Sequence, residues 1–281
     1  MGSITNLFLG YHINEQIYAG TRTLVYRGLR SSNGQPVAIK LLRNNFPCFN
    51  ELVHFRNQYV IAKNLEIPGS VKAYSLETYQ NHYALVMEDF GGISLSSYLA
   101  RLASESNEPL ESLPVSEFLP IAIQIANSLD GLYRHHVIHK DLKPANILIN
   151  PSSKEVKLID FSIASLLPRE TQEIQTPNVL EGTLPYISPE QTGRMNRGID
   201  YRTDFYSLGV TFYELLTRQL PFQSEDPIEL VHCHLAKQPI PVHHLNNNVP
   251  LVLSEIVSKL MAKNAEERYQ SALGLKFDLE T

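Results

Sequence analysis

Residues 139–146, which read HKDLKPAN, are the stretch that decides how the chain is interpreted. Asp141, Lys143 and Asn146 bring a carboxylate, an ammonium group and an amide together in one short segment. Pro144 is incompatible with a regular helix interior, so we expect a rigid loop that projects these side chains. An aspartate can accept a hydroxyl proton, a lysine can neutralise a phosphoryl group, and an asparagine can offer an oxygen to Mg²⁺. The loop is therefore a candidate site of phosphoryl-transfer chemistry.

A second carboxylate follows this loop a short distance along the chain. Apolar runs at 147–149 and 156–159 flank the turn sequence at 150–153 and predict a hairpin. Asp160 stands directly at the exit of that hairpin, so its side chain should return to the neighbourhood of Asn146. Two oxygen ligands at the two ends of one hairpin predict a Mg²⁺ site.

A lysine on a predicted strand lies further upstream. Residues 37–42 read as a strand, in which Ala38 and Lys40 share one face because side chains alternate. A small residue beside a lysine suits a nucleotide, whose base can lie against Ala38 while the ammonium reaches the phosphates. Lys40 alone could equally be a solvated lysine on an edge strand, and the downstream motifs favour the nucleotide.

The order of predicted elements indicates two lobes of different composition. Further strand-like runs and one helical pattern, near 52–62, precede residue 90; the runs lie at 8–13, 24–27, 70–76 and 83–87. Beyond Gly91 and Gly92 the apolar period becomes helical, over 118–132, 208–215, 251–261 and 271–279. We expect an α+β, bilobal fold with a small β-rich lobe at 1–87, a hinge and larger helical lobe at 88–281, and a ligand cleft between them.

The composition is that of a globular protein. Of the 281 residues, 43% are hydrophobic and 19% charged, which excludes collagen, coiled coil and long disorder. A net charge of −5 argues against a nucleic-acid or anionic-membrane partner, and no apolar run is long enough for membrane insertion. Two cysteines, Cys48 and Cys233, lie far apart and indicate a reducing, cytoplasmic compartment.

The motifs occur in an order that resembles a eukaryotic-type protein serine/threonine kinase domain along nearly the whole chain. Lys40 matches the strand lysine of that family, Asp141 its catalytic-loop aspartate, and Asp160 the aspartate of its Asp-Phe-Gly motif. Glu190 ends a Ser-Pro-Glu segment that resembles Ala-Pro-Glu, and Arg268 matches the arginine that pairs with this glutamate. The resemblance implies the bilobal kinase fold, with adenosine triphosphate in the cleft.

Three further matches narrow the resemblance. Asp204 begins a stretch that resembles the family's buried Asp-x-Trp-Ser-x-Gly. Lys143 and Thr183 stand where serine/threonine kinases, rather than tyrosine kinases, carry a lysine and a threonine, and Thr183 is expected to hydrogen-bond near Asp141. The implied activity is transfer of the γ-phosphoryl group to Ser/Thr hydroxyls of a protein substrate in signal transduction.

The resemblance also implies a role for each site residue. Asp141 would orient the hydroxyl and accept its proton, Lys143 would stabilise the transferring phosphoryl group, and Asn146 with Asp160 would hold Mg²⁺. Met87 would be the gatekeeper beside the adenine. The remaining ATP contacts would come from Lys40 at the phosphates, from backbone groups of Glu88 and Phe90, and from Ile17, Gly20, Val25, Ala38 and Leu148.

The helix of the small lobe departs from the family pattern. In active kinases a glutamate there pairs with the strand lysine. Counting back seven residues from Leu65 places this position at Gln58. Glu51 lies seven residues earlier, about 10.5 Å along a helix axis, which is too far to replace it. We therefore expect Gln58 to face Lys40 through a hydrogen bond without ion-pair attraction.

Two other departures concern the phosphate loop and the catalytic loop. Residues 18–25, YAGTRTLV, keep only the middle glycine, Gly20, so backbone amides should approach the phosphates less closely and ATP handling should be weaker. Lys140 replaces an arginine that clamps a phosphorylated activation segment. Activity should therefore depend little on phosphorylation of Thr171 or Thr176.

Residues 191–204 resemble more narrowly the N-terminal kinase domain of large bacterial, notably cyanobacterial, signalling proteins. Those proteins resemble a kinase fused to ATPase-like, GAF and histidine-kinase domains, so further signalling domains in the parent chain are expected. Two alternatives stay open. The first is a pseudokinase-like nucleotide-binding regulatory module, which Gln58 and the glycine-poor loop favour. The second is a small-molecule kinase of the aminoglycoside or choline type. Such kinases share a catalytic Asp and Asn but generally lack a segment like 183–190.

Overall fold

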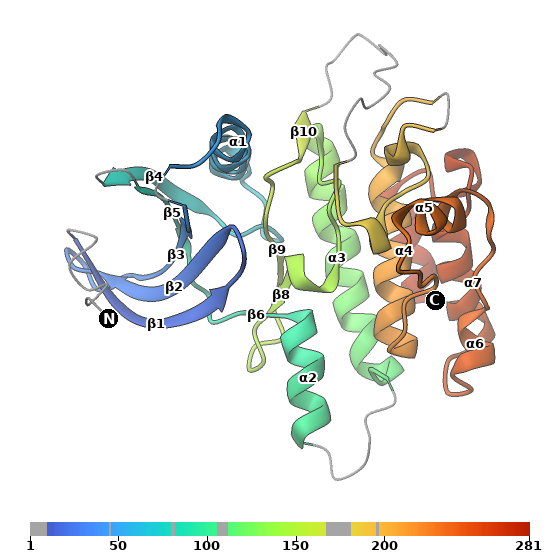
Figure 1. The fold of residues 1–281 in the computed structure, drawn as a ribbon. Helices are drawn as coiled ribbons and strands as arrows, with labels where there is room; N and C mark the ends of the chain where they lie inside the picture. The colour runs from blue at the N-terminus through green and yellow to red at the C-terminus, as the bar shows by residue number, and fades with distance from the viewer. Residues whose placement is uncertain (1–9, 45, 80–81, 106–111, 167–180, 195–196) are drawn as a thin grey trace.

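A computed structural model describes residues 10–44, 46–79, 82–105, 112–166, 181–194 and 197–281 (Figure 1). The chain forms a β-rich lobe, blue to cyan at the left of Figure 1, and a helical lobe, green to red at the right. The bilobal α+β architecture predicted from the sequence is confirmed. No described helix is long and apolar enough to cross a lipid bilayer.

In the part of the chain that the structure describes, the β-rich lobe contains five strands and one helix. The strands are β1 (Tyr11–Ala19), β2 (Thr23–Arg30), β3 (Pro36–Leu42), β4 (Ala73–Tyr79) and β5 (His82–Glu88), and the helix is α1 (Phe49–Asn64). They form one antiparallel sheet in the order β1-β2-β3-β5-β4, with α1 against β4. The pairing Val25–Lys40 between β2 and β3, and Ala38–Met87 between β3 and β5, places these four side chains on one face.

The bounds of two strands differ from those predicted. The sequence places the first strand at 8–13, of which 8 and 9 lie outside the described residues, whereas β1 continues to Ala19. Irregularities after Ile13 and Gln16 break the alternation that marks a strand in sequence. β4 begins at Ala73 rather than residue 70, because Ser70 forms a parallel bridge with Leu158 of the other lobe.

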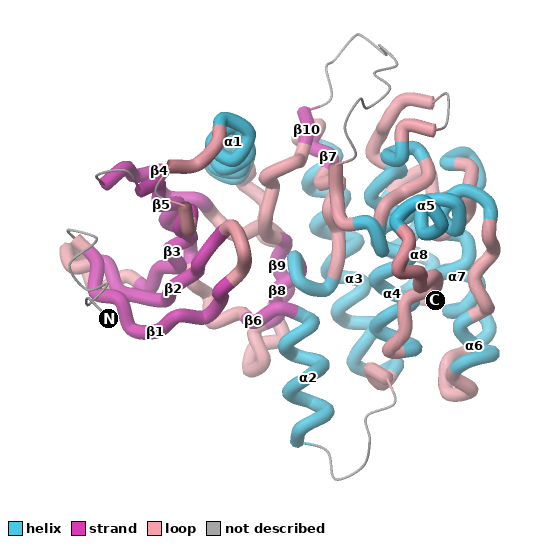
Figure 2. The backbone as a smooth tube through the Cα atoms, in the orientation of Figure 1, coloured by secondary structure: helices cyan, strands magenta, loops and turns pink. Residues whose placement is uncertain are grey.

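The helical lobe is built around two long central helices. Its helices are α2 (Leu95–Glu105), α3 (Val115–Arg134), α4 (Arg202–Thr217), α5 (Pro227–Ala236), α6 (Val242–Leu245), α7 (Leu251–Leu260) and α8 (Ala272–Glu280), drawn cyan in Figure 2. α3 and α4 meet through the edge-to-face rings of Phe118 and Phe212, whose centroids lie 4.9 Å apart. α3 also packs along α8.

Helix α2 was not among the elements predicted from the sequence. Leu95, Tyr98 and Leu99 are buried at helical spacing, but serines at 94, 96 and 97 lower the local helix propensity. Burial of these three side chains against the lobe therefore outweighs the weak local preference.

Two small sheets of short strands belong to the helical lobe and lie on its side toward the β-rich lobe (Figure 1). β6 (Ile93–Ser94), β8 (Ile147–Ile149) and β9 (Val156–Leu158) form a three-stranded sheet, and β7 (Val137–Ile138) pairs with β10 (Ser165–Leu166). The predicted hairpin is thus present as β8–β9, and the Ile159 N–H donates to Asn146 O at 3.0 Å. This bond holds the two ends of the hairpin together.

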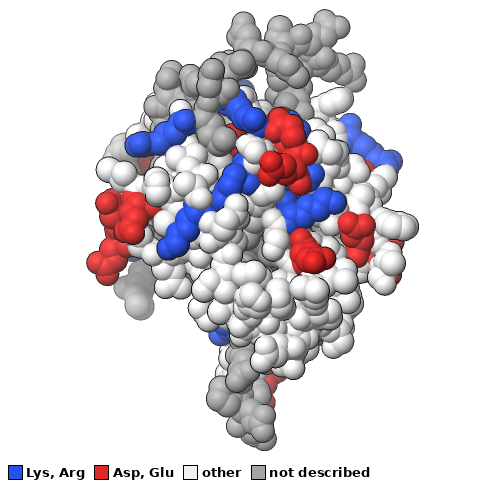
Figure 3. Space-filling view, turned by 90° about the vertical axis from the view of Figure 1, so that its right-hand side faces the viewer, with Lys and Arg blue, Asp and Glu red and all other residues white. Residues whose placement is uncertain are grey.

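The far end of the helical lobe carries charges of both signs. Figure 3 faces the side on which α5, α6 and α7 lie in Figure 1. Lysine and arginine side chains are interspersed with aspartate and glutamate there rather than gathered by sign. Within this lobe, residues 238–254 contain no Lys, Arg, Asp or Glu.

Candidate active site

The loop 139–143 is shaped by a buried carboxylate from α4. Asp204 is fully buried and accepts the backbone N–H of His139 at 2.9 Å and of Lys140 at 2.8 Å. Lys140 adopts a left-handed backbone with φ of 66°, which is uncommon for a residue with a Cβ. Burial raises the pKa of the Asp204 carboxyl, while the two N–H donors oppose that rise. The carboxylate thus fixes the backbone that leads into Asp141.

Asp141 lies at the centre of three polar side chains. Its Oδ2 accepts Lys143 Nζ at 2.7 Å and Asn146 Nδ2 at 2.8 Å, and its Oδ1 accepts the Thr183 hydroxyl at 2.7 Å. Lys143 also donates to Thr183 Oγ1 at 2.5 Å. The structure therefore brings the three loop residues and the distant Thr183 together. Because Asn146 uses its amide nitrogen on Asp141, its carbonyl oxygen is the atom left for a cation.

Lys40 lies between the other two predicted partners. Its Nζ donates to Gln58 Oε1 at 2.8 Å, and it forms an ion pair with Asp160 Oδ1 at 3.1 Å. The contact predicted between Lys40 and Gln58 is therefore present, and Gln58 is only 3% exposed. Gln58 Nε2 approaches the Met87 sulfur at 4.0 Å on its other side. No carboxylate of α1 balances the lysine charge among the described residues.

Asp160 has the properties expected of a metal ligand. Burial disfavours its charged form, but the Lys40 ammonium together with Ser162 and His139 outweighs that effect, so the pKa of this carboxyl lies below its usual value. Its Oδ1 is buried and makes no hydrogen bond of good geometry with any described residue. An ionised carboxylate whose Oδ1 meets Lys40 only through the ion pair, at the end of a hairpin that the Ile159–Asn146 backbone bond ties to Asn146, fits a hard cation such as Mg²⁺.

The residues predicted to surround the adenine are spread over both lobes. Ala38 and Met87 lie on the Lys40 face of the sheet, and Leu148 lies on β8. All three pack against the main hydrophobic core. Val25 shares the sheet face, whereas Ile17 on β1 is 42% exposed.

Contacts on both sides anchor the predicted hinge residues. The Glu88 N–H donates to Lys72 O at 2.9 Å, and its carboxylate pairs with Lys157 at 2.7 Å. The Phe90 carbonyl accepts Asn150 Nδ2 at 2.6 Å. These bonds occupy the Glu88 amide and engage the Phe90 oxygen, so they hold the backbone between β5 and β6 in place.

The glycine-poor loop is covered by its own tyrosine. A Cβ placed on Gly20 would lie 2.5 Å from the Tyr18 hydroxyl and 2.7 Å from its ring. The Tyr18 side chain, which stands where the family has its first glycine, therefore folds over Gly20. Gly20 also donates its N–H to Thr23 O at 2.9 Å. A glycine is therefore required at position 20 by the packing of Tyr18, independently of any contact with phosphate.

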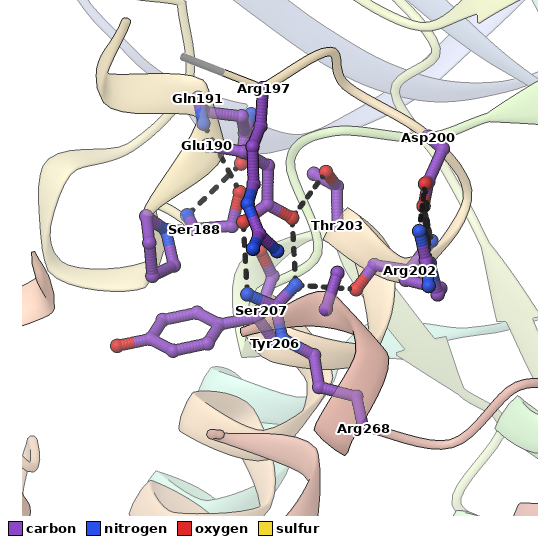
Figure 4. Close-up of polar contacts among 12 residues, drawn as sticks. Ser188, Glu190, Gln191, Arg197, Asp200, Arg202, Thr203, Tyr206, Ser207 and Arg268 are labelled. Atoms are coloured by element: carbon purple, nitrogen blue, oxygen red, sulfur yellow. Dashed lines mark hydrogen bonds and ion pairs between the residues drawn. The ribbon is translucent and has the colours of Figure 1, made fainter. Parts of the chain in front are cut away.

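The segment that follows Thr183 rests on a buried ion pair (Figure 4). Arg268 Nη1 and Nη2 bind the two carboxylate oxygens of Glu190 at 2.7 and 2.9 Å, and the residues are 2% and 4% exposed. The Thr203 hydroxyl also donates to Glu190, at 2.7 Å. The Gln191 side chain accepts the Ser188 N–H through Oε1 at 3.1 Å and donates Nε2 to the Lys140 carbonyl at 2.9 Å. The catalytic loop is thereby tied to this segment.

Sequence reasoning missed three polar anchors. Arg27 reaches from β2 to Asp89 and to the Gly92 carbonyl, at 3.0 and 2.7 Å. Asn57 on α1 reaches the segment after Asp160, and Gln191 joins the loops described above. Residue type and local pattern do not reveal these contacts, since each side chain also bonds a group more than fifty residues away in sequence. Thr171 and Thr176 lie outside the described residues.

Comparison with known proteins agrees with this geometry. The family described as "Protein kinase domain" matches residues 11–276. A probable serine/threonine-protein kinase of Clostridium perfringens is 31% identical over 271 residues, covering 96% of this chain and 38% of that protein. Serine/threonine-protein kinase PrkC of Bacillus subtilis is 32% identical over 274 residues, covering 96% and 40%.

A longer relative matches a smaller share of the chain. A hybrid signal transduction histidine kinase, G, of Dictyostelium discoideum is 36% identical over 235 residues, covering 60% of this chain and 7% of that protein. The chain thus spans less than half the length of each of these relatives. With the loop 139–146, Lys40 on β3 and the buried Glu190–Arg268 pair arranged as described, and a family match across both lobes, the chain belongs to the protein kinase domain family.

Proposed function

We propose that this domain transfers the γ-phosphoryl group of ATP to serine or threonine hydroxyls of protein substrates. The observation that carries the proposal is the convergence of Lys143, Asn146 and Thr183 on Asp141. Lys40 on β3 forms an ion pair with Asp160, which follows β9, and this pair supports a nucleotide with its metal at that point. Serine/threonine kinase relatives along 96% of the chain support the choice of acceptor.

Each side chain has a distinct task in this proposal. Asp141 holds the acceptor hydroxyl and takes its proton, because its carboxylate is the acceptor at the centre of the site. Lys143 lies beside it and neutralises charge on the transferring group. Lys40 binds the other phosphates. Mg²⁺, when held by Asn146 and Asp160, supplies further charge neutralisation at the phosphate oxygens. The chemistry is mainly positioning and electrostatic stabilisation.

The nucleotide is proposed to lie between the sheet and β8. Ala38, Val25 and Ile17 would cover one side of the adenine and Leu148 the other, with Met87 at the back. The Glu88 carbonyl and the Phe90 N–H, rather than the Glu88 N–H and Phe90 carbonyl that bond Lys72 and Asn150, would meet its polar edge, and Gly20 would lie above the phosphates. The packing of Ala38, Met87 and Leu148 against the core supports this arrangement.

A protein is the proposed substrate, because a substrate platform is built into the helical lobe. Thr183 and Glu190 bound a segment fixed at one end by Asp141 and at the other by the buried Arg268. Such a platform suits an extended peptide rather than a small molecule. We propose that the domain works inside a larger signalling protein, as the match to a far longer histidine kinase supports. The free cysteines, Cys48 and Cys233, support a reducing, cytoplasmic location.

A pseudokinase-like nucleotide-binding module is the second candidate. It is favoured by the neutral Gln58 at Lys40 and by the Tyr18 ring over Gly20. Both features lower the expected rate of phosphoryl transfer, but neither removes a group that acts on the phosphates or the hydroxyl. The intact set around Asp141 therefore favours the active enzyme.

One experiment separates the two candidates. The purified domain is incubated with Mg²⁺ and labelled ATP, with casein or myelin basic protein as acceptor, and phosphosites are mapped. We expect Ser/Thr phosphorylation that Asp141→Asn and Lys40→Ala each abolish while circular dichroism stays unchanged. Nucleotide binding without transfer in the wild type would establish the pseudokinase instead, and full transfer by Asp141→Asn would overturn the catalytic assignment.

A second set of variants tests the part played by Gln58. Gln58→Glu should preserve or raise activity, since it adds a carboxylate to the Lys40 hydrogen bond, whereas Gln58→Ala should lower it. Glu51→Ala is the matched control on the same helix. Glu51 accepts the Cys48 N–H at 2.9 Å at the start of α1 and should matter little for transfer. Greater damage from Glu51→Ala than from Gln58→Ala would contradict the alignment.

A further inference from the structure

Helix α1 makes a second polar contact with the cleft, one residue before Gln58. The Asn57 side-chain nitrogen lies 2.9 Å from Ala164 O, 3.1 Å from Ser162 O and 3.4 Å from Phe161 O. These carbonyls belong to the segment directly after Asp160. A single amide group therefore bonds the helix of the small lobe to the backbone that carries the proposed metal ligand.

The turn that receives Asn57 is compact. Ala164 donates its N–H to Phe161 O at 3.3 Å, and the Phe161 side chain is 1% exposed. The carbonyls of this turn point toward α1, where the two hydrogens of the Asn57 amide meet them. Asp160 itself has a left-handed backbone with φ of 67°, which makes the start of the segment dependent on its surroundings.

The uncharged Gln58 makes this second contact more important than it would be beside a glutamate. A Lys–Glu ion pair would draw α1 toward the sheet, but here Lys40 meets a neutral amide at 2.8 Å. The remaining attachment of α1 on this side comes from apolar residues such as Phe55 and Ala62, whose contacts are not directional. Asn57 supplies directional bonds.

We propose that Asn57 is a positioning residue that holds α1 in register with residues 161–164. By this bond it keeps Gln58 on Lys40 and keeps Asp160 aimed at the phosphates, so it partly replaces the missing ion pair. The rate effect rests on the phosphoryl transfer proposed above, whereas the attachment of α1 does not. Asn57 touches neither substrate nor metal in this scheme.

Three single variants test the hydrogen bonds. Asn57→Ala removes the donors and should lower kcat about tenfold, or about 1.4 kcal/mol, with little change in the KM for peptide. Asn57→Asp has nearly the same shape but places a carboxylate among three carbonyl oxygens, so it should be at least as damaging. Asn64→Ala is the matched control, because Asn64 lies on the same helix and its side chain, among the residues described, bonds only Val60 O of that helix.

A double variant tests whether Asn57 replaces an ion pair. In a Gln58→Glu background the helix regains a charged contact with Lys40, so Asn57→Ala should lower kcat by less than about threefold. If Asn57→Ala lowered kcat by the same factor in the wild-type and Gln58→Glu backgrounds, Asn57 would not be replacing the missing ion pair. A mild effect of Asn57→Asp would likewise overturn the role of the donated hydrogens.

Hydrogen exchange gives a readout that does not require catalysis. In Asn57→Ala, amides of 161–166 and of α1 should exchange about tenfold faster than in wild type, with Asn64→Ala unchanged. If the wild type transfers no phosphoryl group but this pattern holds, the positioning role stands and the proposed function fails. Unchanged exchange in Asn57→Ala would overturn the inference whatever the activity.

Discussion

Removal of the Arg268 charge should destabilise the helical lobe strongly. Arg268 has five N–H donors, and all are used: Nε on Ala262 O, two on Glu190, and one each on Arg202 O and Lys263 O. Arg268→Met leaves the Glu190 carboxylate buried without its cation. Breaking such a pair costs about 3–5 kcal/mol of unfolding free energy, which lowers Tm by about 6–10 °C for a chain of this size.

Two further variants divide this cost between charge and hydrogen bonds. Arg268→Lys keeps the charge, but one ammonium cannot reach both carboxylate oxygens and three carbonyls, so we expect roughly half of the loss. Arg268→Met combined with Glu190→Leu removes the unpaired charge. It still removes the N–H groups that Arg268 donates to three backbone carbonyls, at about 1 kcal/mol each, so the double variant should recover only part of the stability.

The assay is urea denaturation followed by circular dichroism, since the chain has no tryptophan. Arg197→Met is the matched control, because Arg197 pairs with Glu266 on the surface, where the side chains are 42% and 60% exposed. Its cost should stay below about 1 kcal/mol. A loss under about 1 kcal/mol for Arg268→Met, or one equal to that of Arg197→Met, would refute the argument from burial.

Three other predictions follow from the same structure. Asp204→Asn should cost about 1–3 kcal/mol in denaturation and lower the transfer rate at least tenfold, since an amide oxygen cannot readily accept both loop N–H groups; an unchanged rate would contradict this. Burial lowers the pKa of Lys263 to about 8, so the unfolded chain keeps that proton at higher pH than the folded one. The unfolding free energy of the wild type should therefore rise relative to that of Lys263→Met between about pH 8 and 10.5, and the two should change in parallel below pH 7. If the two free energies changed in parallel over the whole range, the lowered pKa of Lys263 would be excluded. Phosphatase treatment should change activity less than about tenfold, because Lys140 cannot grip a phosphate bidentately, and kinetic assay before and after treatment decides this.

The local parts of the site were predictable from the sequence. Asp141, Lys143 and Asn146 lie in one short loop that Pro144 keeps out of a regular helix, so their proximity needs no distant contact. The alternation of a strand places Ala38 and Lys40 on one face, as the register with β5 confirms. The hairpin of β8 and β9 was likewise predictable, because its turn and its apolar runs are contiguous in sequence.

The family pattern also predicted one contact between residues that lie in different elements, Gln58 and Lys40. Counting along the helical repeat placed Gln58 opposite Lys40, and the two side chains do meet. The neutral character of that contact follows from residue type alone. Its geometry, with Asp160 on the other side of the lysine, does not.

Only the tertiary structure decided the contacts between segments that have no shared sequence period. Ser70 bridges Leu158 and thereby moves the start of β4, and Asp204 shapes a loop more than sixty residues earlier through its 2.9 Å bond to His139. Asn57 reaches three carbonyls across the lobes. Each of these contacts joins segments that lie far apart in the sequence and meet only through tertiary packing, so local patterns of hydrophobicity carry no signal for them.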